Sequence, residues 1–397
     1  MGIRLALVAM VALCGAAATP ADTLRFKYAA GDKYKISGTV EEEVYVNGRL
    51  DHRAQILNKI AAEVTQVRED SGLLRATFQT SERRTDSVPF GLDQDYESEF
   101  WRDGRGVYDI DPRLFMPVVR DVPLFPPGEI KPGDSWVGAG SEAHDFRQNG
   151  IPEPLAFPIT VAYRYVRDEL TDGRRIAVIG MDYTVFQRMQ LRRVLAEFDP
   201  VLITGFSSQL LRFDIELGQP VSYEERFDFI FTLSSGDTVE YRGSAVSELT
   251  ETPALDRQKL ADEIRKALDK ERVQNVTVGV GEQGVTITLE NVQFGPDSAV
   301  LLPAEKQKLQ KIADIIRPID RDVLVVGHTA RVGSEETSQT LSEARARSVV
   351  SYLLSLGAKK QAQIVYRGMG SQEPIADNST EAGRSRNRRV EITILEN

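Results

Sequence analysis

Cysteine and histidine are scarce in this sequence. Of its 397 residues one is a cysteine, Cys14, and three are histidines, His52, His144 and His328, which lie far apart along the chain. A chain with a single thiol forms no internal disulfide, so packing alone must stabilise its fold. The sequence also has no spacing typical of a metal-ligand cluster or of a nucleophile beside a base. We therefore expect no catalytic residue, no metal and no cofactor, and nothing indicates an enzyme.

Long apolar runs are also missing. After residue 21 no apolar stretch reaches the length of about 20 residues that a transmembrane helix needs. Residues 1–21 combine a basic Arg4, an apolar stretch at Leu5–Leu13 and small residues, which is typical of a secretion signal cleaved after residue 21. A lipoprotein signal with a lipidated Cys14 is the alternative, although Leu13 is larger than the residue that usually precedes such a cysteine.

Basic residues are outnumbered by acidic ones. The chain holds 59 Asp and Glu against 49 Lys and Arg, which gives a net charge of −10. An acidic protein is poorly suited to bind nucleic acid or anionic lipid through charge alone. Gly279–Gly284 has the spacing G-x-G-x-x-G, but a dinucleotide site needs a helix after this motif, and Val285–Leu289 has the pattern of a strand. We expect neither nucleic acid nor nucleotide as a partner.

Alternation of apolar and polar residues dominates from Leu24 to Glu248. In Leu211–Leu217 every second residue is apolar, and the polar face consists of Arg212, Asp214 and Glu216. Residues 218–220, Gly-Gln-Pro, predict a turn, and Val221–Leu233 then alternates again, so we expect a hairpin. The inward face of its second strand consists of Tyr223, Phe227, Phe229 and Phe231, with Glu225 as the one polar exception. Similar stretches occur at Tyr34–Asn47, Ala54–Val67 and Leu73–Thr80.

Nine prolines between residues 111 and 158 interrupt this pattern. They predict that no regular ladder forms there and that a long ordered excursion crosses one end of a β structure. We predict that residues 22–250 form an all-β antiparallel domain of no recognised family, either a sandwich or a lipocalin-like barrel. Outer-membrane barrels also have alternating strands, but the sequence lacks the aromatic girdles and the regular strands of about ten residues that are typical of them.

The rest of the chain mixes helical and strand patterns. Residues 251–274 are predicted to be a linker and a connecting helix, with Leu260, Ile264 and Leu268 on one stripe. Residues 275–397 are predicted to be an α+β domain. Its helices should begin near Pro303 and span about Glu335–Leu356. Its later strands should include Val323–Val326, Ile364–Arg367 and Arg389–Leu395.

Three blocks in this last region carry a family resemblance. They read V-L-V-V-G-H-T-A-R-V-G from Val323, L-S-E-A-R-A-R-S-V from Leu341, and P-I-A-D-N-S-T-E-A-G-R-S-R-N-R-R-V from Pro374. In order and spacing they resemble the OmpA-like domain, a periplasmic module that grips peptidoglycan without a covalent bond, over residues 283–397. The resemblance implies a place in the periplasm or outer membrane of a diderm bacterium and peptidoglycan as the partner.

The resemblance also implies a binding site for diaminopimelate, whose side chain ends in an ammonium and a carboxylate. Arg345 is retained where the family places an arginine, and a guanidinium suits a carboxylate because it donates two parallel hydrogen bonds. Ser338 stands where the family has an asparagine, and Arg388 is expected at the rim of the pocket. Alternatively, the arginines in this segment form only a solvated basic cluster; they are Arg384, Arg386, Arg388 and Arg389.

The acidic half of the family pattern has changed. Ala330 replaces the aspartate that would meet the ammonium, Val332 stands where a small polar residue is common, and Gly295 stands where an aspartate is common. Loss of one partner from a buried charged pair costs about 2–5 kcal/mol, and each ~1.4 kcal/mol is a factor of ten in affinity. The resemblance therefore implies peptidoglycan binding in a weakened or altered mode.

Other hypotheses remain open at this point. Glu335, Glu336 or Asp297 would restore the acid if one of them approached the ammonium from another direction, and ornithine would be a different ligand. In a second hypothesis, the OmpA-like scaffold no longer binds peptidoglycan and binds another envelope protein as a structural or interaction module. As a third hypothesis, the β-rich domain would carry an apolar ligand.

Overall fold

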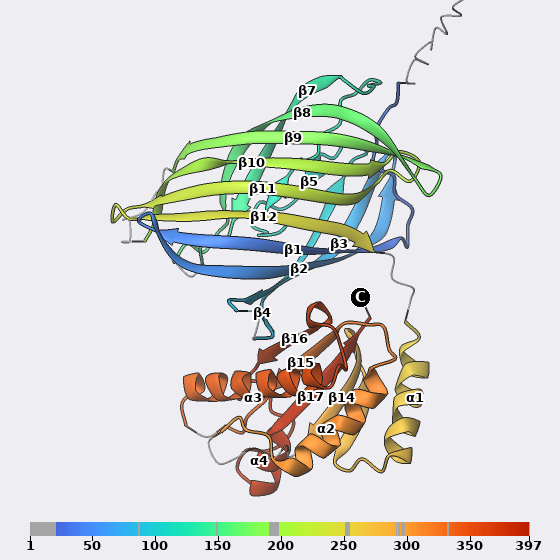
Figure 1. Cartoon of the computed structure of the whole chain (residues 1–397), viewed down its shortest axis with the longest axis vertical. Coiled ribbons are helices and arrows are strands. Elements are labelled where there is room, and N and C mark those ends of the chain that lie inside the picture. Colours follow the sequence, from blue (N-terminus) through green and yellow to red (C-terminus); the bar gives the residue numbers. More distant parts are fainter. Residues whose placement is uncertain are drawn as a thin grey trace, which may run out of the picture.

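The computed structural model describes residues 21–85, 88–147, 150–189, 198–250, 255–290, 292, 294, 298–331 and 333–396. Within these residues the chain forms a β-rich part, β1 to β12, and a part of mixed helices and strands, α1 to β17 (Figure 1). The expected signal segment up to residue 20, with Cys14, lies outside the described residues.

The β-rich part is a continuous antiparallel meander. Its long strands are β1 (Lys33–Val46), β2 (Arg49–Arg68), β3 (Ser71–Arg83), β4 (Phe90–Arg102), β7 (Ser135–His144), β8 (Leu155–Thr171), β9 (Arg174–Arg188), β10 (Pro200–Asp214), β11 (Gln219–Leu233) and β12 (Thr238–Thr250). Pairing runs in sequence order from β7 to β12, passes from β12 to β1, and continues from β1 to β4. The expectation of an antiparallel all-β region is confirmed, and the strands curve around an interior (Figure 1).

Turn chemistry explains the two hairpins that the sequence predicts best. Asn47 and Gly48 join β1 to β2 with φ values of 50° and 73°, the left-handed conformation that an Asn-Gly turn requires. The β10–β11 hairpin also forms, but its predicted boundary is wrong. Strand β10 ends at Asp214, which is 1% exposed and accepts hydrogen bonds from the backbone N–H groups of residues 216 and 217. Asp214 is therefore the buried centre of the turn, and Leu217, predicted to face inward, is 45% exposed.

The proline-rich segment is more regular than expected. Residues 111–134 form only β6 (Val119–Arg120), after the equally short β5 (Tyr108–Asp109), but β7 and β8 pair regularly, so the prediction that the prolines prevent a ladder is wrong there. Pro158 lies within β8 opposite Ser141, at a place where β8 pairs with β7 but not with β9, so its missing N–H interrupts no second ladder. The fully buried Phe125 of this segment packs against Phe213 of β10, with ring centres 4.8 Å apart.

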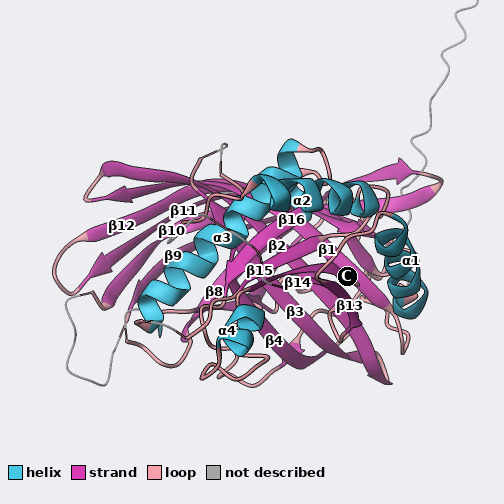
Figure 2. Cartoon of the chain, turned by 90° about the horizontal axis from the view of Figure 1, so that it is seen from below, coloured by secondary structure: helices cyan, strands magenta, loops and turns pink. Residues whose placement is uncertain are grey.

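The C-terminal part is a five-stranded sheet with helices on one face. The strands are β13 (Val276–Val280), β14 (Gly284–Glu290), β15 (Val323–Gly327), β16 (Ile364–Gly368) and β17 (Arg389–Leu395), paired in the order β13, β14, β17, β15, β16. The helices are α1 (Arg257–Lys270), α2 (Pro303–Ile316), α3 (Glu335–Ser355) and the short α4 (Glu381–Asn387), with a 3₁₀ turn at Gln361–Gln363 (Figure 2). Every helix and strand predicted in this region is present.

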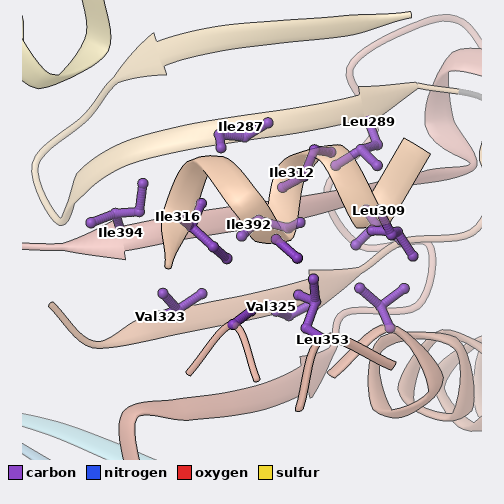
Figure 3. Packing of buried hydrophobic residues seen from close by; sticks show 14 of the residues in the cluster. Ile287, Leu289, Leu309, Ile312, Ile316, Val323, Val325, Leu353, Ile392 and Ile394 are labelled. Atoms are coloured by element: carbon purple, nitrogen blue, oxygen red, sulfur yellow. The ribbon is translucent and has the colours of Figure 1, made fainter. Parts of the chain in front are cut away.

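The core of this part lies between the sheet and the helices. Ile287 of β14, Val325 of β15 and Ile392 of β17 are fully buried and meet side chains from α2 and α3, such as Leu309 and Leu353 (Figure 3). The stripe predicted on the connecting helix, Leu260, Ile264 and Leu268, joins the same cluster, so α1 packs on the C-terminal part. Because the residues of this stripe recur at the period of a helix, the sequence pattern was sufficient to predict it.

The glycine-rich motif at residues 279–284 forms the tip of the β13–β14 hairpin. Gly281 and Gly284 exchange backbone hydrogen bonds across it, and β14 follows it directly. A Cβ at Gly284 would lie 2.0 Å from the carbonyl oxygen of Ile394, so glycine is needed here for close approach to β17. The prediction that a strand rather than a helix follows the motif is confirmed.

The contacts between the two parts include a short ladder, a small apolar cluster and several ionic and polar contacts. Strand β16 pairs in parallel with the start of β4, and the cluster around this ladder contains Phe90, Val365 and Leu324. Asp322, 9% exposed, forms ion pairs with Lys35 of β1 and, at 3.0 Å, with Lys59 of β2. Burial lowers the pKa of Lys59, and the charge of Asp322 opposes that shift.

None of the helices in the described part of the chain has the length and apolarity needed to cross a membrane.

Substitution Asp322→Asn should destabilise the protein. It leaves the Lys35 and Lys59 ammonium groups facing each other with little water, and breaking such a pair costs about 3 kcal/mol. The free energy of unfolding, measured by urea titration followed by circular dichroism, should fall by this amount. The control is Asp314→Asn, which removes an ion pair with Arg317 from an aspartate whose side chain is 55% exposed, and it should change the stability by less than about 1 kcal/mol. Equal stabilities of the two variants would contradict the importance of the ionic contact.

Candidate functional site

The segment with the altered acidic position follows β15 and is held by backbone hydrogen bonds on both sides. His328 donates to the carbonyl of Arg389, and Thr329 donates to the carbonyl of Gly370. Ala330, next in the chain, is 5% exposed. A methyl group therefore occupies a buried position, where an aspartate would need a donor or a cation to be stable.

Helix α3 packs closely against this segment. The backbone N–H of Gly370 donates to Ser342 Oγ at 2.9 Å, so Gly370 bonds both to α3 and, through its carbonyl, to Thr329. A Cβ at Gly327 would lie 2.3 Å from the carbonyl oxygen of Ser342, which requires glycine at the end of β15. These contacts bring the segment around Ala330 beside the middle of α3.

Arg345 and Ser338, both predicted site residues, lie on α3 in different environments. Ser338 is 4% exposed, so it belongs to the helix packing rather than to an open surface. Arg345 is partly exposed, its Nε donates to the carbonyl oxygen of Ser298 at 3.3 Å, and its guanidinium lies 4.9 Å from the ring centre of Phe294. Contacts with the segment after β14 thus hold the retained arginine in place.

The other predicted departures, Gly295 and Val332, and the alternative acid Asp297 lie outside the described residues. Of the two remaining alternative acids, Glu335 accepts a hydrogen bond from Gln372 Nε2 at 3.0 Å. Both Glu335 and Glu336 are exposed residues of the first turn of α3.

Arg388 is the C-cap of α4 and is paired with an acid of the same segment. Its Nη2 donates to Glu381 Oε1 at 2.7 Å, and Arg384 bonds the other oxygen of that carboxylate at 2.9 Å. Arg388 first, and Arg384 after it, hold the pKa of Glu381 below its usual value. The guanidinium expected at the pocket rim is therefore engaged by Glu381, an acid that the sequence reasoning did not consider.

The idea of a solvated basic cluster is wrong for Arg389. This residue is 3% exposed, and its Nε donates to Glu391 Oε1 at 2.6 Å. Burial acts to raise the pKa of Glu391, but contacts with His328 and Arg389 outweigh it and lower the pKa to about 2. The side chain of His328 is 1% exposed, with Nε2 3.8 Å from Glu391, so it is packed at the strand end as expected.

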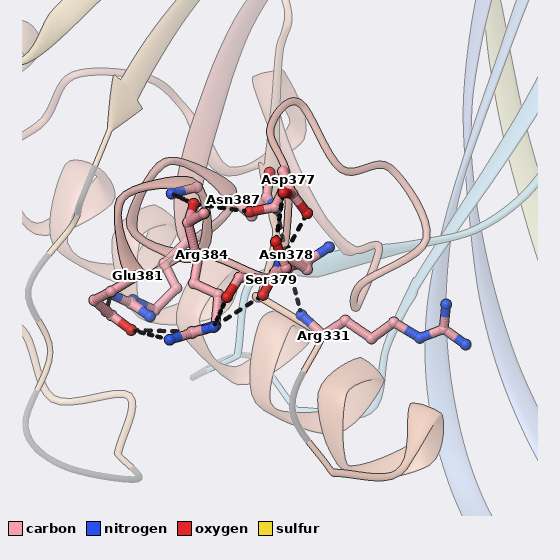
Figure 4. Close-up of polar contacts among 10 residues, drawn as sticks. Arg331, Asp377, Asn378, Ser379, Glu381, Arg384 and Asn387 are labelled. Carbon is pink, nitrogen blue, oxygen red and sulfur yellow. Dashed lines mark hydrogen bonds and ion pairs between the residues drawn. The ribbon is translucent and has the colours of Figure 1, made fainter.

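Asn387 is a structural residue of the site that sequence reasoning missed. It is fully buried, its Oδ1 accepts from the backbone N–H groups of Ile375 and Ala376, and its Nδ2 donates to Asn378 Oδ1 (Figure 4). Asn378 Oδ1 also accepts from the backbone N–H of Arg331, whose guanidinium extends away from this network (Figure 4). Asn387 thus links the loop before α4 to the segment that carries Ala330. Asn387 is the first residue of the retained N-R-R-V run, and this run was the sequence signal that could have identified it.

The arrangement carries several arginines. Arg345 is partly exposed on α3, Arg331 is exposed directly after the buried Ala330, and the carboxylate of Glu381 pairs with two arginines. No group of three or more His, Cys, Asp or Glu side chains within the described ranges is arranged to hold a metal ion. The arrangement suits recognition of a carboxylate or a carbonyl better than acid–base chemistry.

Comparison with known proteins identifies the C-terminal region. The model of the OmpA family matches residues 293–388. The outer-membrane lipoprotein YfiB of Pseudomonas aeruginosa is 41% identical over 122 residues, which cover 28% of this chain and 72% of that protein.

Two further relatives match over a smaller fraction of their own length. Outer membrane protein A of Bordetella avium is 43% identical over 103 residues, 26% of this chain and 53% of that protein. The peptidoglycan-binding protein ArfA of Mycobacterium tuberculosis is 40% identical over 104 residues, 26% of this chain and 32% of that protein. With the sheet and helices described above, these matches show that the chain belongs to the OmpA family, through its C-terminal region.

Proposed function

We propose that this protein is a non-enzymatic component of the cell envelope whose C-terminal domain associates with peptidoglycan in a weakened or altered mode. One observation carries the proposal: Arg345 is kept on α3, while the adjacent strand-end segment has the buried Ala330 in place of an acid. A relative with 40% identity over this region is named as a peptidoglycan-binding protein, which supports the choice of partner.

The expected mode of binding follows from charge. A guanidinium at residue 345 would bond the carboxylate of a stem peptide, and the peptide's ammonium would stay in water or would meet an exposed acid such as Glu336. Exposed charge pairs contribute about 0–1 kcal/mol, much less than a buried pair. Contact through the carboxylate alone would therefore be weaker and less selective than contact through both groups.

A second candidate is an interaction module that binds another envelope protein and no peptidoglycan. The observation in its favour is that the arginines of residues 384–389 all have acidic partners: Glu381 pairs with Arg384 and Arg388, Glu290 with Arg386, and Glu391 with Arg389. A stem peptide would have to displace Glu381 to reach Arg388.

The same proposal includes the organisation and place of the chain. We assign residues 1–21 to a signal, 22–250 to a β-rich domain, 251–274 to a linker and connecting helix, and 275–397 to the OmpA-like domain. The β-rich domain is best regarded as an incompletely closed barrel, because its strand pairing is continuous from β7 to β4. Names of the relatives, an outer-membrane lipoprotein and an outer membrane protein, support the periplasm or outer membrane as its location.

Binding to purified sacculi that contain meso-diaminopimelate should depend on Arg345. Substitution Arg345→Ala removes the donor to the carboxylate, so retention should weaken about tenfold or more in a pull-down titration. The matched control is Arg347→Ala, which removes an exposed arginine two residues along the same helix and should leave retention unchanged. If the unmodified protein is not retained at all, the interaction-module candidate replaces the proposal.

Substitution Ala330→Asp should strengthen binding. An aspartate would restore the charge partner of the ammonium, and a buried pair of this kind is worth about 2–5 kcal/mol, or about 30-fold or more in affinity. Isothermal titration with a diaminopimelate-containing peptide measures the gain. In the double variant Ala330→Asp, Arg345→Ala the gain should disappear, since both groups act on one ligand. A folded Ala330→Asp variant with unchanged affinity would mean that the pocket is altered beyond this one residue.

A further inference from the structure

The β-rich part contains a cavity of about 900 Å³ that is separate from the site on the OmpA-like domain. Its wall is formed by residues of β1, β4, β6, β7, β9, β11 and β12 and by the segments before β6 and after β7. This volume is within the range of cavities that hold small molecules, about 300–1,000 Å³.

One side of the cavity is aromatic. Three rings of β11 line it, and tyrosines of β9 and β12 stand beside them: Phe227, Phe229, Phe231, Tyr183 and Tyr241. The rings of Phe227 and Phe229 are inclined by 29° with centres 6.4 Å apart, and the ring of Tyr241 meets that of Phe231 edge-on at 5.7 Å. Ring faces of this kind attract apolar groups and organic cations.

The other feature of the cavity is an excess of carboxylates. Glu42, Glu142, Glu225, Asp93 and Asp145 line it, whereas the basic side chains in its wall are Arg147 and His144. Arg147 is paired with Asp145 at 2.6 Å, and His144 Nε2 lies 2.6 Å from Glu142 Oε2. The cavity wall therefore remains negative after these pairs have formed.

Glu142 is the residue that points to a ligand. It is 2% exposed, and its second carboxylate oxygen, Oε1, accepts no hydrogen bond that meets ordinary geometry among the described residues. Burial first, and the Glu142 carboxylate after it, raise the pKa of Tyr183, so the tyrosine hydroxyl lies beside this acid. A buried carboxylate oxygen without a donor is costly, so a donor supplied by a ligand would stabilise it. Glu225 is the polar exception that the sequence places on the inward face of β11, and it accepts from Ser207 Oγ at 2.7 Å.

The electrostatics of these acids agree with a site for a cation. Burial raises the pKa of Glu225, and the nearby charge of Glu142 raises it further against the hydrogen bonds from Ser207 and Gln209. Burial, with a contribution from Glu82, raises the pKa of Glu42 to about 7. A positive charge among these groups would relieve the repulsion between them.

We propose that this cavity binds an organic cation, a primary or secondary ammonium on an apolar or aromatic body. The ammonium donates to Glu142 Oε1 and to Glu225, and the body lies against the rings of β11. An uncharged apolar ligand, as the sequence first led us to consider, would leave Glu142 Oε1 buried without a donor, and an anion would be repelled by the acids of the wall. This inference does not rest on the function proposed for the OmpA-like domain.

The test uses dansylcadaverine, a fluorescent primary amine, and dansylamide, which carries the same fluorophore without the aminoalkyl chain. Titrated into the full-length protein at pH 8, dansylcadaverine should bind at least tenfold more tightly than dansylamide. Glu142→Gln and Glu225→Gln should each weaken the binding of dansylcadaverine about tenfold or more, because each keeps the side-chain shape and removes the charge. The matched control is Glu97→Gln, an exposed acid of β4, which should leave it unchanged.

Several outcomes would overturn the proposal. They are equal affinities for the two probes, which would indicate an apolar site, no binding of dansylcadaverine, and undiminished binding in both folded glutamine variants. Circular dichroism establishes the folding of each variant. If one glutamine variant fails to fold, the other variant and the comparison of the two probes still test the proposal. Binding to sacculi is measured in parallel and should not change in these variants, so failure of one proposal is distinguishable from failure of the other.

Discussion

A charge that is withdrawn from water needs an opposite charge or a set of hydrogen-bond donors, and this constraint organises the polar interior of the protein. Asp322 meets two lysines, Arg389 meets Glu391, and Asp214 accepts two backbone N–H groups. Glu142 departs from this rule, because its Oε1 accepts no hydrogen bond within the described residues, a condition that Asp228 Oδ1 of β11 shares. Where this constraint is satisfied, the charged groups contribute to the structure. Where it is not, a ligand is the simplest way to satisfy it.

The same constraint explains how the OmpA-like fold tolerates the change at residue 330. Its core consists of apolar residues such as Ile287, Val325 and Ile392, and its close backbone contacts depend on Gly327 and Gly370. None of these contacts needs an acid after β15. An alanine at this buried position needs neither a donor nor a cation, so under the proposed function residue 330 affects ligand recognition rather than the scaffold.

Much of the C-terminal fold could be predicted from the sequence, because helix and strand periodicity is strong there. The stripe on α1 and the glycine that ends α3 lay where the pattern placed them. Asp214 and Leu217 could not be placed, since alternation does not reveal where a strand gives way to a turn stabilised by a side chain. Asn387 was missed for a related reason: its role depends on backbone groups of residues 375 and 376, which only the folded loop brings to it. The hypothesis of a carrier for an apolar ligand anticipated a cavity in the β-rich part but not the acids that line it, although Glu225 already broke the apolar face of its strand.

A few charged residues are important for the contact between the two parts. Within the described part of the chain the parallel ladder joins Val365 to Phe90 and Tyr366 to Gly91, and the apolar cluster beside it is small. An interface of this kind is weakly fixed by hydrophobic burial, so directional contacts must set the relative orientation. Asp322 with Lys35 and Lys59, and Arg367 with Asp95 at 2.9 Å, supply such contacts at separate points. Two points of attachment restrict rotation where one would not. The ionic contacts therefore determine how the β-rich part is held against the OmpA-like domain.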